Sequence, residues 1–387
     1  MLITLTLPAW GIERIALRRK WKSAWRYLFY LPNLLIAIGL VALAANESYS
    51  ASADYWKGTL LTLTLCLTIP ECITAILLLP VLLLRKHAPK ATRFMSCAAL
   101  GLGAVFFCIM LYGFTLGYRQ ITTQEVTFAS HRIPSNFDGF RIVQISDLHL
   151  GTLHGRGNVV EQMVKAVNAC QPDLVVFTGD LVNYRSSELF EFEEELKKIS
   201  ARHGVISVMG NHDYAQYFRH ASSADSLADI RLLQQHQREM GWNLLLNENV
   251  TLHSGNDSIA IIGVENNGRK PFPALANLEK AQQGLKEDCF KILLSHDPTH
   301  WRSNVLPETN IDLTLSGHTH GMQFKIGSLS PASWFYDEWG GIYQEPDGRT
   351  LHVSLGTGSV MMPFRLGAWP EINLITLKRD SINHKEQ

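Results

Sequence analysis

Three long apolar stretches occupy the first third of the chain, and each is long enough for a helix that crosses a membrane. They run from about residue 27 to 45, from 59 to 84 and from 95 to 117, whereas a spanning helix needs ~20 predominantly apolar residues. A soluble protein would have to bury three nearly uncharged helices on all sides. We therefore predict an all-α membrane region of about three helices over residues 1–121. The opening residues 1–12 are too short to span and are expected at the membrane interface.

After residue 121 the pattern changes to short β-rich runs with helical stretches between several of them. The near-continuous apolar runs suit strands that are covered on both faces. The predicted strands are residues 141–146, 174–178, 205–209, 259–264, 291–295, 312–316, 352–355 and 372–377. The predicted helices are residues 158–169, 187–200 and 225–240. We expect an α/β domain over residues 122–387, joined to the membrane region by the polar stretch 119–134.

Charge is distributed unevenly between these two parts. The 387 residues contain 35 basic and 35 acidic side chains, a formal net charge of zero. The first 121 residues hold 12 Lys and Arg against four Asp and Glu, so they carry +8 and the remainder carries −8. A nucleic-acid-binding domain needs a basic face for the phosphates. The acidic remainder therefore argues against a nucleic-acid partner, and nothing in the sequence indicates a protein partner.

Basic residues also predict the topology, since cytoplasmic loops are enriched in Lys and Arg. The segment before the first span carries Arg14, Arg18, Arg19, Lys20, Lys22 and Arg26. The first loop offers only Lys57 against Glu47 and Asp54, and the second loop has Arg85, Lys86, Lys90 and Arg93. This alternation places the N-terminus and the second loop in the cytoplasm. The α/β domain is then expected on the outer side of the membrane.

The middle span is unusual because it contains Pro70, Glu71 and Pro80. A carboxyl group within a membrane is costly and marks either a functional site or a group paired with another helix. We favour the structural interpretation of Glu71. If this segment were a re-entrant hairpin, the α/β domain would face the cytoplasm instead.

Candidate metal ligands follow five of the predicted strands. The carboxyl ends of strands in an open α/β sheet are where ligands gather, and Asp, Asn and His suit divalent transition metals. Gly179, Gly210 and Gly317 would let the backbone turn sharply beside a compact centre. In chain order the polar residues are Asp147 and His149, Asp180, Asn211 and His212, His296, and His318 and His320.

This ordered set resembles the calcineurin-like metallophosphoesterase family, whose pattern is D-x-H, GD, GNH, H and GHTH. The resemblance covers about residues 137–377, and the closing stretch from residue 354 is similar to membrane-associated bacterial phosphohydrolases of the family. It implies a four-layer αββα sandwich. Met322 stands where these relatives often have a second Gly after GHTHG, a departure that leaves the ligand positions untouched.

The resemblance further implies a centre with two divalent ions, such as Mn, Fe or Zn. One ion would be held by Asp147, His149 and His320, and the other by Asn211, His296 and His318, with Asp180 bridging both. A hydroxide shared by two ions ~3.5–4 Å apart can attack phosphorus in line. His212 is the implied catalytic residue, which protonates the leaving oxygen or stabilises charge near it.

Several other residues allow two interpretations. Arg365 could meet a substrate phosphate or pair with Glu371. The aromatic run from Trp334 to Trp339 could pack into the core or form an apolar rim that touches lipid. Asp213 is expected to orient the GNH loop. His154, His300 and His352 are expected at the surface or beside the site.

Three functions remain open at this point. The leading hypothesis is a membrane-anchored, metal-dependent phosphodiesterase or pyrophosphatase in a bacterial inner or plasma membrane. Its membrane anchor suits a lipid-linked phosphate ester. The enzymatic alternative is a cytoplasm-facing pyrophosphatase of a UDP-sugar lipid precursor. The non-enzymatic alternative is a membrane sensor whose phosphoesterase-like domain only binds a ligand.

Overall fold

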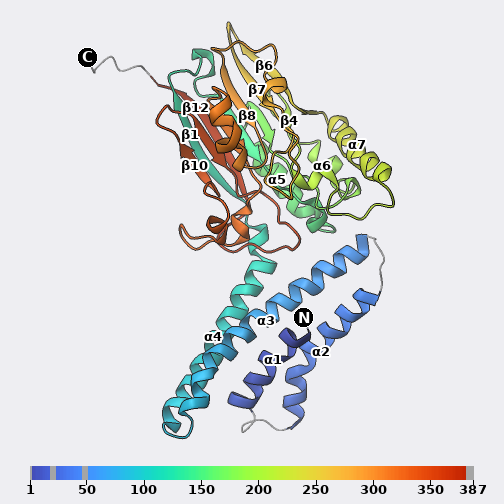
Figure 1. The fold of residues 1–387 in the computed structure, drawn as a ribbon, viewed down its shortest axis with the longest axis vertical. Helices are drawn as coiled ribbons and strands as arrows, with labels where there is room; N and C mark the ends of the chain where they lie inside the picture. The colour runs from blue at the N-terminus through green and yellow to red at the C-terminus, as the bar shows by residue number, and fades with distance from the viewer. Residues whose placement is uncertain (1, 18–22, 46–50, 381–387) are drawn as a thin grey trace, which may run out of the picture. The chain divides into compact units, whose positions relative to one another are not determined.

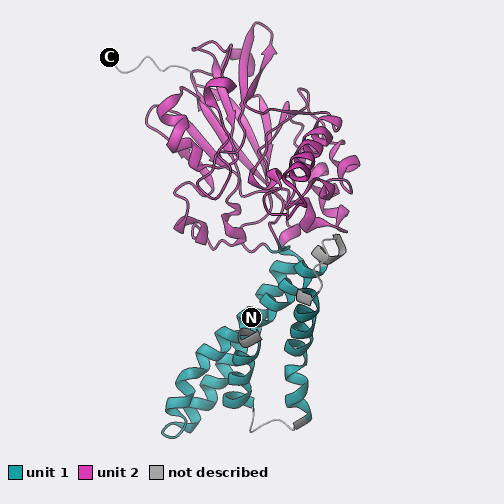
Figure 2. Ribbon diagram, turned by 45° about the vertical axis from the view of Figure 1, so that its right-hand side comes forward, with its two compact units in different colours: residues 1–117, 362–364 teal, residues 118–361, 365–387 magenta. Residues whose placement is uncertain are grey.

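The chain folds into two compact units. The computed structural model describes residues 2–17, 23–45 and 51–380, and Figure 1 follows their elements along the chain. The first unit comprises Met1–Gly117 with Met362–Phe364, and the second comprises Tyr118–Met361 with Arg365–Gln387 (Figure 2).

The first unit is helical, as predicted. Its helices are α1 (Leu2–Ile12), α2 (Ser23–Ala45), α3 (Ala51–Leu84) and α4 (Pro89–Thr115), and a π-helical turn, η1 (Glu13–Leu17), continues α1. Among the described residues, three stretches are long and apolar enough to cross a membrane: Ala24–Leu43, Trp56–Leu84 and Pro89–Arg119. The prediction of three apolar helices in this region is thus confirmed. Arg18, Arg19, Lys20, Lys22 and Glu47, which entered the topology prediction, lie outside the described residues.

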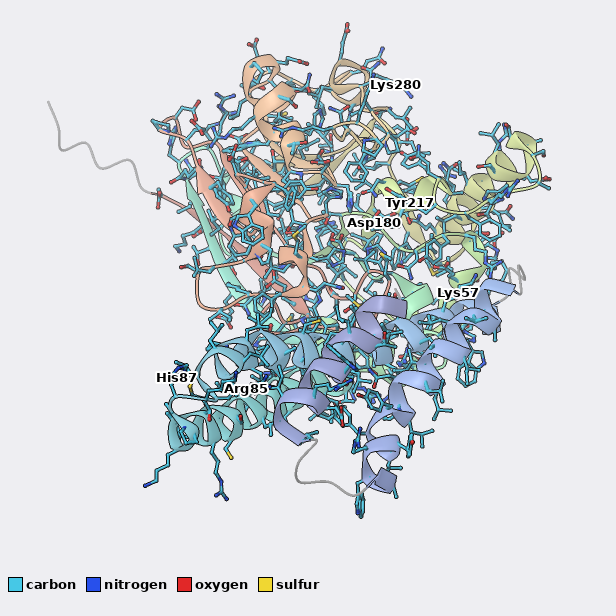
Figure 3. All side chains as sticks on the ribbon, turned by 60° about the horizontal axis from the view of Figure 1, so that its bottom comes forward. Lys57, Arg85, His87, Asp180, Tyr217 and Lys280 are labelled. Carbon is cyan, nitrogen blue, oxygen red and sulfur yellow. The ribbon has the colours of Figure 1, made fainter. Side chains whose placement is uncertain are left out.

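The middle span is one continuous helix. α3 passes through Pro70 and Pro80 without turning back, so the re-entrant alternative is wrong. Lys57 lies near the start of α3, and Arg85 follows its end (Figure 3). Lys57 is the single basic residue near the start of this helix, whereas Arg85 and Lys86 both follow its end, and the topology prediction rests on this distribution.

Glu71 is paired with a neighbouring helix. Its Oε2 accepts a hydrogen bond of 3.0 Å from Asn33 Nδ2 on α2, and the same amide group donates to the Leu5 carbonyl at 2.5 Å. Leu5 and Ala9 of α1 are fully buried. The inner face of α1 is thus covered by protein, although we expected this segment at the membrane interface.

The second unit contains two six-stranded sheets. The first has the order β1 (Thr122–Ser130), β12 (Glu371–Arg379), β2 (Arg141–Ile145), β3 (Leu174–Phe177), β4 (Val205–Ser207), β5 (Trp242–Leu244). The second has the order β10 (Gly341–Gln344), β11 (Thr350–Val353), β9 (Leu313–Ser316), β8 (Phe290–Leu294), β7 (Asp257–Gly263), β6 (Glu248–Ser254). The strands β2 to β5 run parallel to one another, as do β7, β8, β9 and β11. Each parallel set therefore presents its carboxyl ends along one edge.

Helices cover the outer faces of both sheets. One core lies between the sheets, with Ile142 and Val176 packed in the same cluster as Ile261 and Ile292. A second core joins the first sheet to α5 (Gly157–Ala169), α6 (Glu193–Leu196) and α7 (Ser223–Glu239). A third joins the second sheet to α8 (Leu278–Ala281), the π-turn η7 (Trp301–Val305) and α9 (Leu306–Glu308). These layers confirm the predicted αββα sandwich.

Short 3-10 helices occupy many of the connections. They are η2 (Gly117–Arg119), η3 (Ser135–Phe137), η4 (Leu150–Leu153), η5 (Ser186–Glu188), η6 (Asn211–Tyr214), η8 (His320–Gln323) and η9 (Pro331–Trp334). Several of them begin at or beside the predicted metal ligands. They turn the chain within a few residues of the strand ends.

Two predicted segments differ from the structure. The polar junction 119–134 contains a nine-residue strand, β1, which pairs in parallel with β12 at the edge of the first sheet. Residues 187–200 form only a short 3-10 turn and one helical turn. Tertiary hydrogen bonds oppose a longer helix there, because Ser186 binds Asp229 and Glu188 accepts from the Asn183 and Tyr184 amides.

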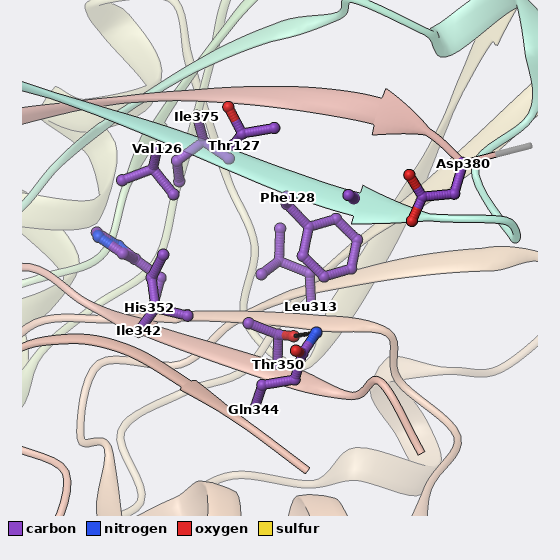
Figure 4. Close-up of a pocket in the computed structure, with 11 residues that line it drawn as sticks. Val126, Thr127, Phe128, Leu313, Ile342, Gln344, Thr350, His352, Ile375 and Asp380 are labelled. Carbon is purple, nitrogen blue, oxygen red and sulfur yellow. Dashed lines mark hydrogen bonds between the residues drawn. The ribbon is translucent and has the colours of Figure 1, made fainter. Parts of the chain in front are cut away.

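A pocket of about 310 Å³ opens between the edge strands of the two sheets (Figure 4). Its lining is mixed, with Phe128, Leu313 and Ile375 beside polar side chains such as Gln344 and Thr350. His352 borders it from β11 while remaining buried, and its Nδ1 donates to Gln144 Oε1 at 2.8 Å. Burial lowers the pKa of His352 to about 4.

This buried imidazole should make the protein sensitive to acid. The unfolded chain takes up a proton near pH 6.5, whereas folded His352 resists protonation down to about pH 4. The contribution of neutral His352 to the free energy of unfolding is therefore complete above pH 6.5. It is lost as the pH falls towards 4, and the total loss is about 3 kcal/mol. In melting curves between pH 7 and 4, His352→Gln should lose less thermal stability than the native chain. An unchanged slope would contradict this assignment, and His253→Gln on the exposed strand β6 is the control.

Candidate metal centre

All eight predicted site residues lie at the carboxyl edges of the two sheets. Asp147 and His149 follow β2, Asp180 follows β3, and Asn211 begins the helical turn after β4. The other three ligand candidates follow β8 and β9: His296, His318 and His320. Most are fully buried, and Figure 3 labels Asp180 among them. The structure brings together residues that are up to 173 positions apart in the chain.

The first cluster contains Asp147, His149 and His320. His320 Nε2 lies 3.2 Å from Asp147 Oδ1 and 3.0 Å from His149 Nε2. One ligand atom from each residue lies within 4.8 Å of the others. A carboxylate and two imidazoles at this separation can coordinate one divalent ion.

The second cluster contains Asp180, His296 and His318. His296 Nε2 lies 3.1 Å from Asp180 Oδ2 and 3.3 Å from His318 Nδ1. The same Asp180 oxygen lies 3.6 Å from His149 Nε2 of the first cluster. Asp180 is therefore shared between two groups of metal-binding side chains.

Two hydrogen-bonding patterns fit a cation at this centre. Asn211 is 1% exposed, and its Nδ2 is hydrogen-bonded to Tyr217 Oη at 3.0 Å. Its Oδ1 has no hydrogen-bond partner among the described residues, although such buried oxygens are normally satisfied. His296 Nδ1 donates to the Thr178 carbonyl at 2.8 Å, which leaves Nε2, on the Asp180 side, as the nitrogen that a cation would bind. An orphaned amide oxygen and an oriented imidazole are donors that a divalent cation would use.

The backbone at the site is strained. Five of the seven ligand candidates have a positive φ, although none of them is glycine: Asp147, His149, Asp180, His318 and His320. Non-glycine residues in this region cluster at functional sites because the surrounding fold must hold them there. Met322 also has a φ of +48°, which explains why a glycine suits this position in relatives.

The glycines beside the ligands allow close approach of the chain. A Cβ on Gly210 would lie 2.2 Å from Asp180 Oδ1, and one on Gly317 would lie 2.2 Å from Asp147 Oδ2. Both distances are far below the van der Waals contact distance of carbon and oxygen. The predicted role of these glycines is therefore a steric one, since any side chain would displace a carboxylate.

The Asp180 carboxylate and the neighbouring imidazoles stabilise one another's charged forms. Burial favours the neutral acid, but the His296 and His212 imidazoles outweigh it and hold the pKa of Asp180 well below its usual range. Burial likewise opposes the charged form of His296, yet the Asp180 carboxylate raises the pKa of His296 to about 10. A proton and a divalent cation compete for the same His296 lone pair, so cation binding should release a proton.

His212 borders both clusters and is only partly buried. Its backbone N–H donates to Asp180 Oδ1 at 2.8 Å, and its Nδ1 donates to the Asn183 carbonyl at 2.8 Å. Its ring stacks on Tyr217 with the centroids 4.2 Å apart. These contacts fix the imidazole and leave Nε2 as the nitrogen available for proton transfer.

Asp213 ties two of the ligand loops together. Its Oδ2 accepts from the Asp180 and Gly210 amides at 2.9 Å, and its Oδ1 accepts from the Leu181 and Val182 amides at 2.8 and 3.2 Å. Burial, together with the nearby Asp180 charge, raises the pKa of Asp213 to about 7. Both carboxylate oxygens are thus occupied by backbone groups, as expected of a residue that orients the GNH loop.

Arg365 interacts with Glu371 through charge alone, since the Glu371 carboxylate opposes the effect of burial, which lowers the pKa of Arg365. It is fully buried and donates to the carbonyls of Gly358, Leu355 and Gly356. Its Nη2 also lies 3.0 Å from His320 Nδ1. Arg365 therefore supports the loop behind His320, and Glu371 instead accepts from the Leu355 amide.

The aromatic run divides between the centre and the surface. Tyr336 Oη lies 3.0 Å from His318 Nε2, so this side chain contacts a ligand candidate. Trp334 and Phe335 are exposed, which excludes the core interpretation for them. Sequence reasoning missed the contacts of Tyr217 and Tyr336, because a single Tyr carries no spacing signal.

The remaining histidines lie outside both clusters. His154 is paired with Glu191 at the surface, and the buried His300 is hydrogen-bonded to Ser295 Oγ at 2.8 Å. His352 lies in β11 beside the pocket between the sheets. None of the three joins a metal-binding group in the described part of the chain.

Comparisons with known proteins agree with this geometry. The family model described as "Calcineurin-like phosphoesterase" matches residues 140–322. A second one, described as "Probable Calcineurin-like phosphoesterase, transmembrane domain", matches residues 1–118. The two matches correspond to the α/β sheets and to the apolar helices.

Relatives with similar names occur in animals and in bacteria. The chain is 31% identical over 262 residues to a Bos taurus "Transmembrane protein with metallophosphoesterase domain", which covers 67% of this chain and 57% of the relative. It is 30% identical over 279 residues to "Uncharacterized metallophosphoesterase YkuE" of Bacillus subtilis, which covers 69% of this chain and 90% of the relative. The matches span less than two thirds of the Bos taurus and Danio rerio relatives. Among solved structures, a phosphopantetheinyl hydrolase from Mycobacterium tuberculosis matches with a TM-score of 0.38 and 16% identity, covering 63% of this chain and 98% of that one.

Proposed function

This chain belongs to the calcineurin-like phosphoesterase family, and from that premise we propose that it is a membrane-anchored, metal-dependent phosphodiesterase or pyrophosphatase. The observation that carries the proposal is the position of Asp180 between two groups of metal-binding side chains. A carboxylate placed between both groups could bind two ions at the ~3.5–4 Å separation found in two-metal phosphatases.

The residues present can be divided into two ligand sets. Asp147, His149 and His320 would hold one divalent ion. The second ion would take His296 and His318 together with the orphaned Asn211 oxygen, and Asp180 would serve both. Ions such as Mn, Fe or Zn bound here would lower the pKa of a water molecule and offset the charge of phosphoryl oxygens.

The side chains of the protein contribute two things to the reaction: a proton donor in a fixed position, and contacts that orient the imidazoles of the ligand candidates. The Asn183 carbonyl holds the Nδ1 proton of His212, so Nε2 can give a proton to the leaving oxygen of the ester. Tyr217 stacks against this imidazole and restricts its rotation. Tyr336 and Arg365 contact the outer nitrogens of His318 and His320 and orient their rings.

We further propose that the substrate is a lipid-linked phosphate ester on the outer side of a bacterial inner or plasma membrane. The apolar helices hold the enzyme in the membrane where such esters are found. The basic residues before α2 and after α3 support an outer position of the metal centre. A reporter that is active only in the cytoplasm, fused after Gln387, should be silent. An active reporter would favour the cytoplasm-facing pyrophosphatase instead.

Hydrolysis of a soluble ester tests the proposed activity. The purified full-length chain should hydrolyse bis-p-nitrophenyl phosphate, lose this activity with a chelator and regain it with Mn, Fe, Zn or Ni. The native chain and a chelator-treated sample that received no metal form the matched pair. Absence of hydrolysis with all four metals would refute the proposal and leave a ligand-binding sensor.

A further inference from the structure

One surface segment exposes large apolar side chains close to the metal centre. It consists of residues 322–335 and is called the apolar loop below. Its four most exposed large apolar side chains are Ile326 (65%), Leu329 (73%), Trp334 (79%) and Phe335 (61%). Four exposed large apolar side chains within ten residues indicate an interaction site more often than a solvated surface.

The apolar loop is held in place by its own hydrogen bonds. Ile326 and Leu329 exchange backbone hydrogen bonds of 2.9 and 3.0 Å around a two-residue tip, where Gly327 has a φ of +59°. The base of this hairpin is anchored by the Lys325 amide, which donates to the Leu366 carbonyl at 2.8 Å. The four apolar side chains are therefore displayed by an ordered backbone.

The second half of the loop is equally fixed. Ser330 Oγ accepts from the Ala332 amide at the start of η9 and donates to the Gly321 carbonyl at 2.6 Å. Trp334 ends this helical turn and Phe335 follows it. Both side chains point outwards although the turn that carries them is capped.

The apolar loop is joined at both ends to residues of the metal centre. It begins two residues after His320 and ends one residue before Tyr336, whose hydroxyl lies 3.0 Å from His318 Nε2. Whatever binds this loop is therefore held beside the ligand candidates. A molecule that binds the exposed apolar side chains would therefore lie near the place where the substrate binds.

A lipid surface fits the loop better than another protein does. Residues 322–336 contain no Asp or Glu and one Lys, Lys325, so nothing in this segment repels anionic headgroups. Trp and Phe beside long aliphatic side chains are the composition found at membrane interfaces. Six residues separate the end of α4 at Thr115 from the start of β1 at Thr122, which limits that connection to ~20 Å. The domain is thus tethered within reach of the bilayer.

We infer that the apolar loop inserts Ile326, Leu329, Trp334 and Phe335 into the headgroup and acyl boundary of the bilayer, and so holds the metal centre at lipid-borne phosphate esters. This inference rests on the proposed function and deepens it. It assigns to the enzyme a lipid-contacting surface, beside the site, in addition to its membrane-spanning helices.

Photocrosslinking in vesicles tests this contact. The full-length chain is prepared with benzoyl-phenylalanine in place of Leu329, and separately in place of Leu227, a 54% exposed residue of α7. Each is reconstituted into vesicles of phosphatidylglycerol and phosphatidylethanolamine and irradiated. We expect a several-fold excess of lipid adduct at position 329 over position 227. Equal labelling at both positions, or a crosslinked dimer at 329, would overturn the inference.

Two further measurements keep the result interpretable. The same substitution at Trp334 repeats the test on the other half of the loop, in case the Leu329 variant fails to fold. Hydrolysis of bis-p-nitrophenyl phosphate is measured on each preparation and does not depend on lipid contact. Active protein without lipid adducts would refute the lipid contact alone, whereas inactive protein with adducts would refute the proposed activity alone.

Discussion

Replacing Asp180 by Asn should lower kcat/KM for a phosphodiester by on the order of 10³-fold, the equivalent of about 4 kcal/mol of transition-state stabilisation. The amide keeps an oxygen that can accept from the His212 backbone N–H, so the loop can retain its shape. It removes the negative charge that lies 3.1 Å from His296 and 3.6 Å from His149. Without that charge, neither group of side chains should retain its cation.

Metal analysis and kinetics on the same purified sample check this expectation. Asp229→Asn is the matched control, because Asp229 is hydrogen-bonded to Ser186 outside both clusters and its loss should leave metal content and turnover unchanged. An Asp180→Asn enzyme with native metal content and full activity would contradict the shared-ligand assignment. An inactive Asp180→Asn variant that kept its full biological role would instead favour a non-catalytic sensor.

Replacing His212 by Ala should reduce turnover by roughly 10²- to 10⁴-fold while leaving metal content nearly intact. The backbone N–H that donates to Asp180 remains in the variant, and the imidazole that protonates the leaving group is lost. The defect should grow with the basicity of the leaving group. A p-nitrophenolate departs without much protonation, whereas an alkoxide needs a proton as it leaves.

Comparison of p-nitrophenyl and alkyl esters therefore separates this role from metal binding. His154→Ala serves as the control, since His154 is exposed and paired with Glu191 away from the centre. Loss of all bound metal in the His212 variant would refute the general-acid assignment. An equal defect on both kinds of ester would point to a role in binding instead.

The fold class and the positions of the candidate site residues were predictable because both depend on short-range patterns. Apolar runs that end in Asp, Asn or His predict parallel strands with ligands at their carboxyl ends, and the structure gathers those residues at one edge. The spans were equally clear from length and composition. Asp180 illustrates the point, since its position after a buried strand was enough to place it near residues distant in sequence.

Features decided by tertiary contacts were not predictable in the same way. Strand β1 lies at a sheet edge with mostly exposed side chains, so its polar sequence resembled a linker, although its Thr, Val and Phe residues favour a strand. The segment 187–200 has helical spacing, yet the contacts of Ser186 and Glu188 hold it in shorter turns. The hydrogen bonds of Arg365 were not predictable because its partners are mostly backbone carbonyls, which no residue pattern reveals.

The left-handed backbone beneath the ligands has a consequence for natural variation and for engineering. Each such residue costs roughly 1–3 kcal/mol, which the well-packed sheets on either side must offset. Glycine adopts this conformation freely, so Asp147→Gly or His149→Gly would relieve backbone strain while abolishing a ligand. Inactive variants of this enzyme can therefore melt at the same temperature as the native chain, or above it. Screens that select for heat resistance alone would enrich for dead catalysts, because activity and robustness are opposed at these positions.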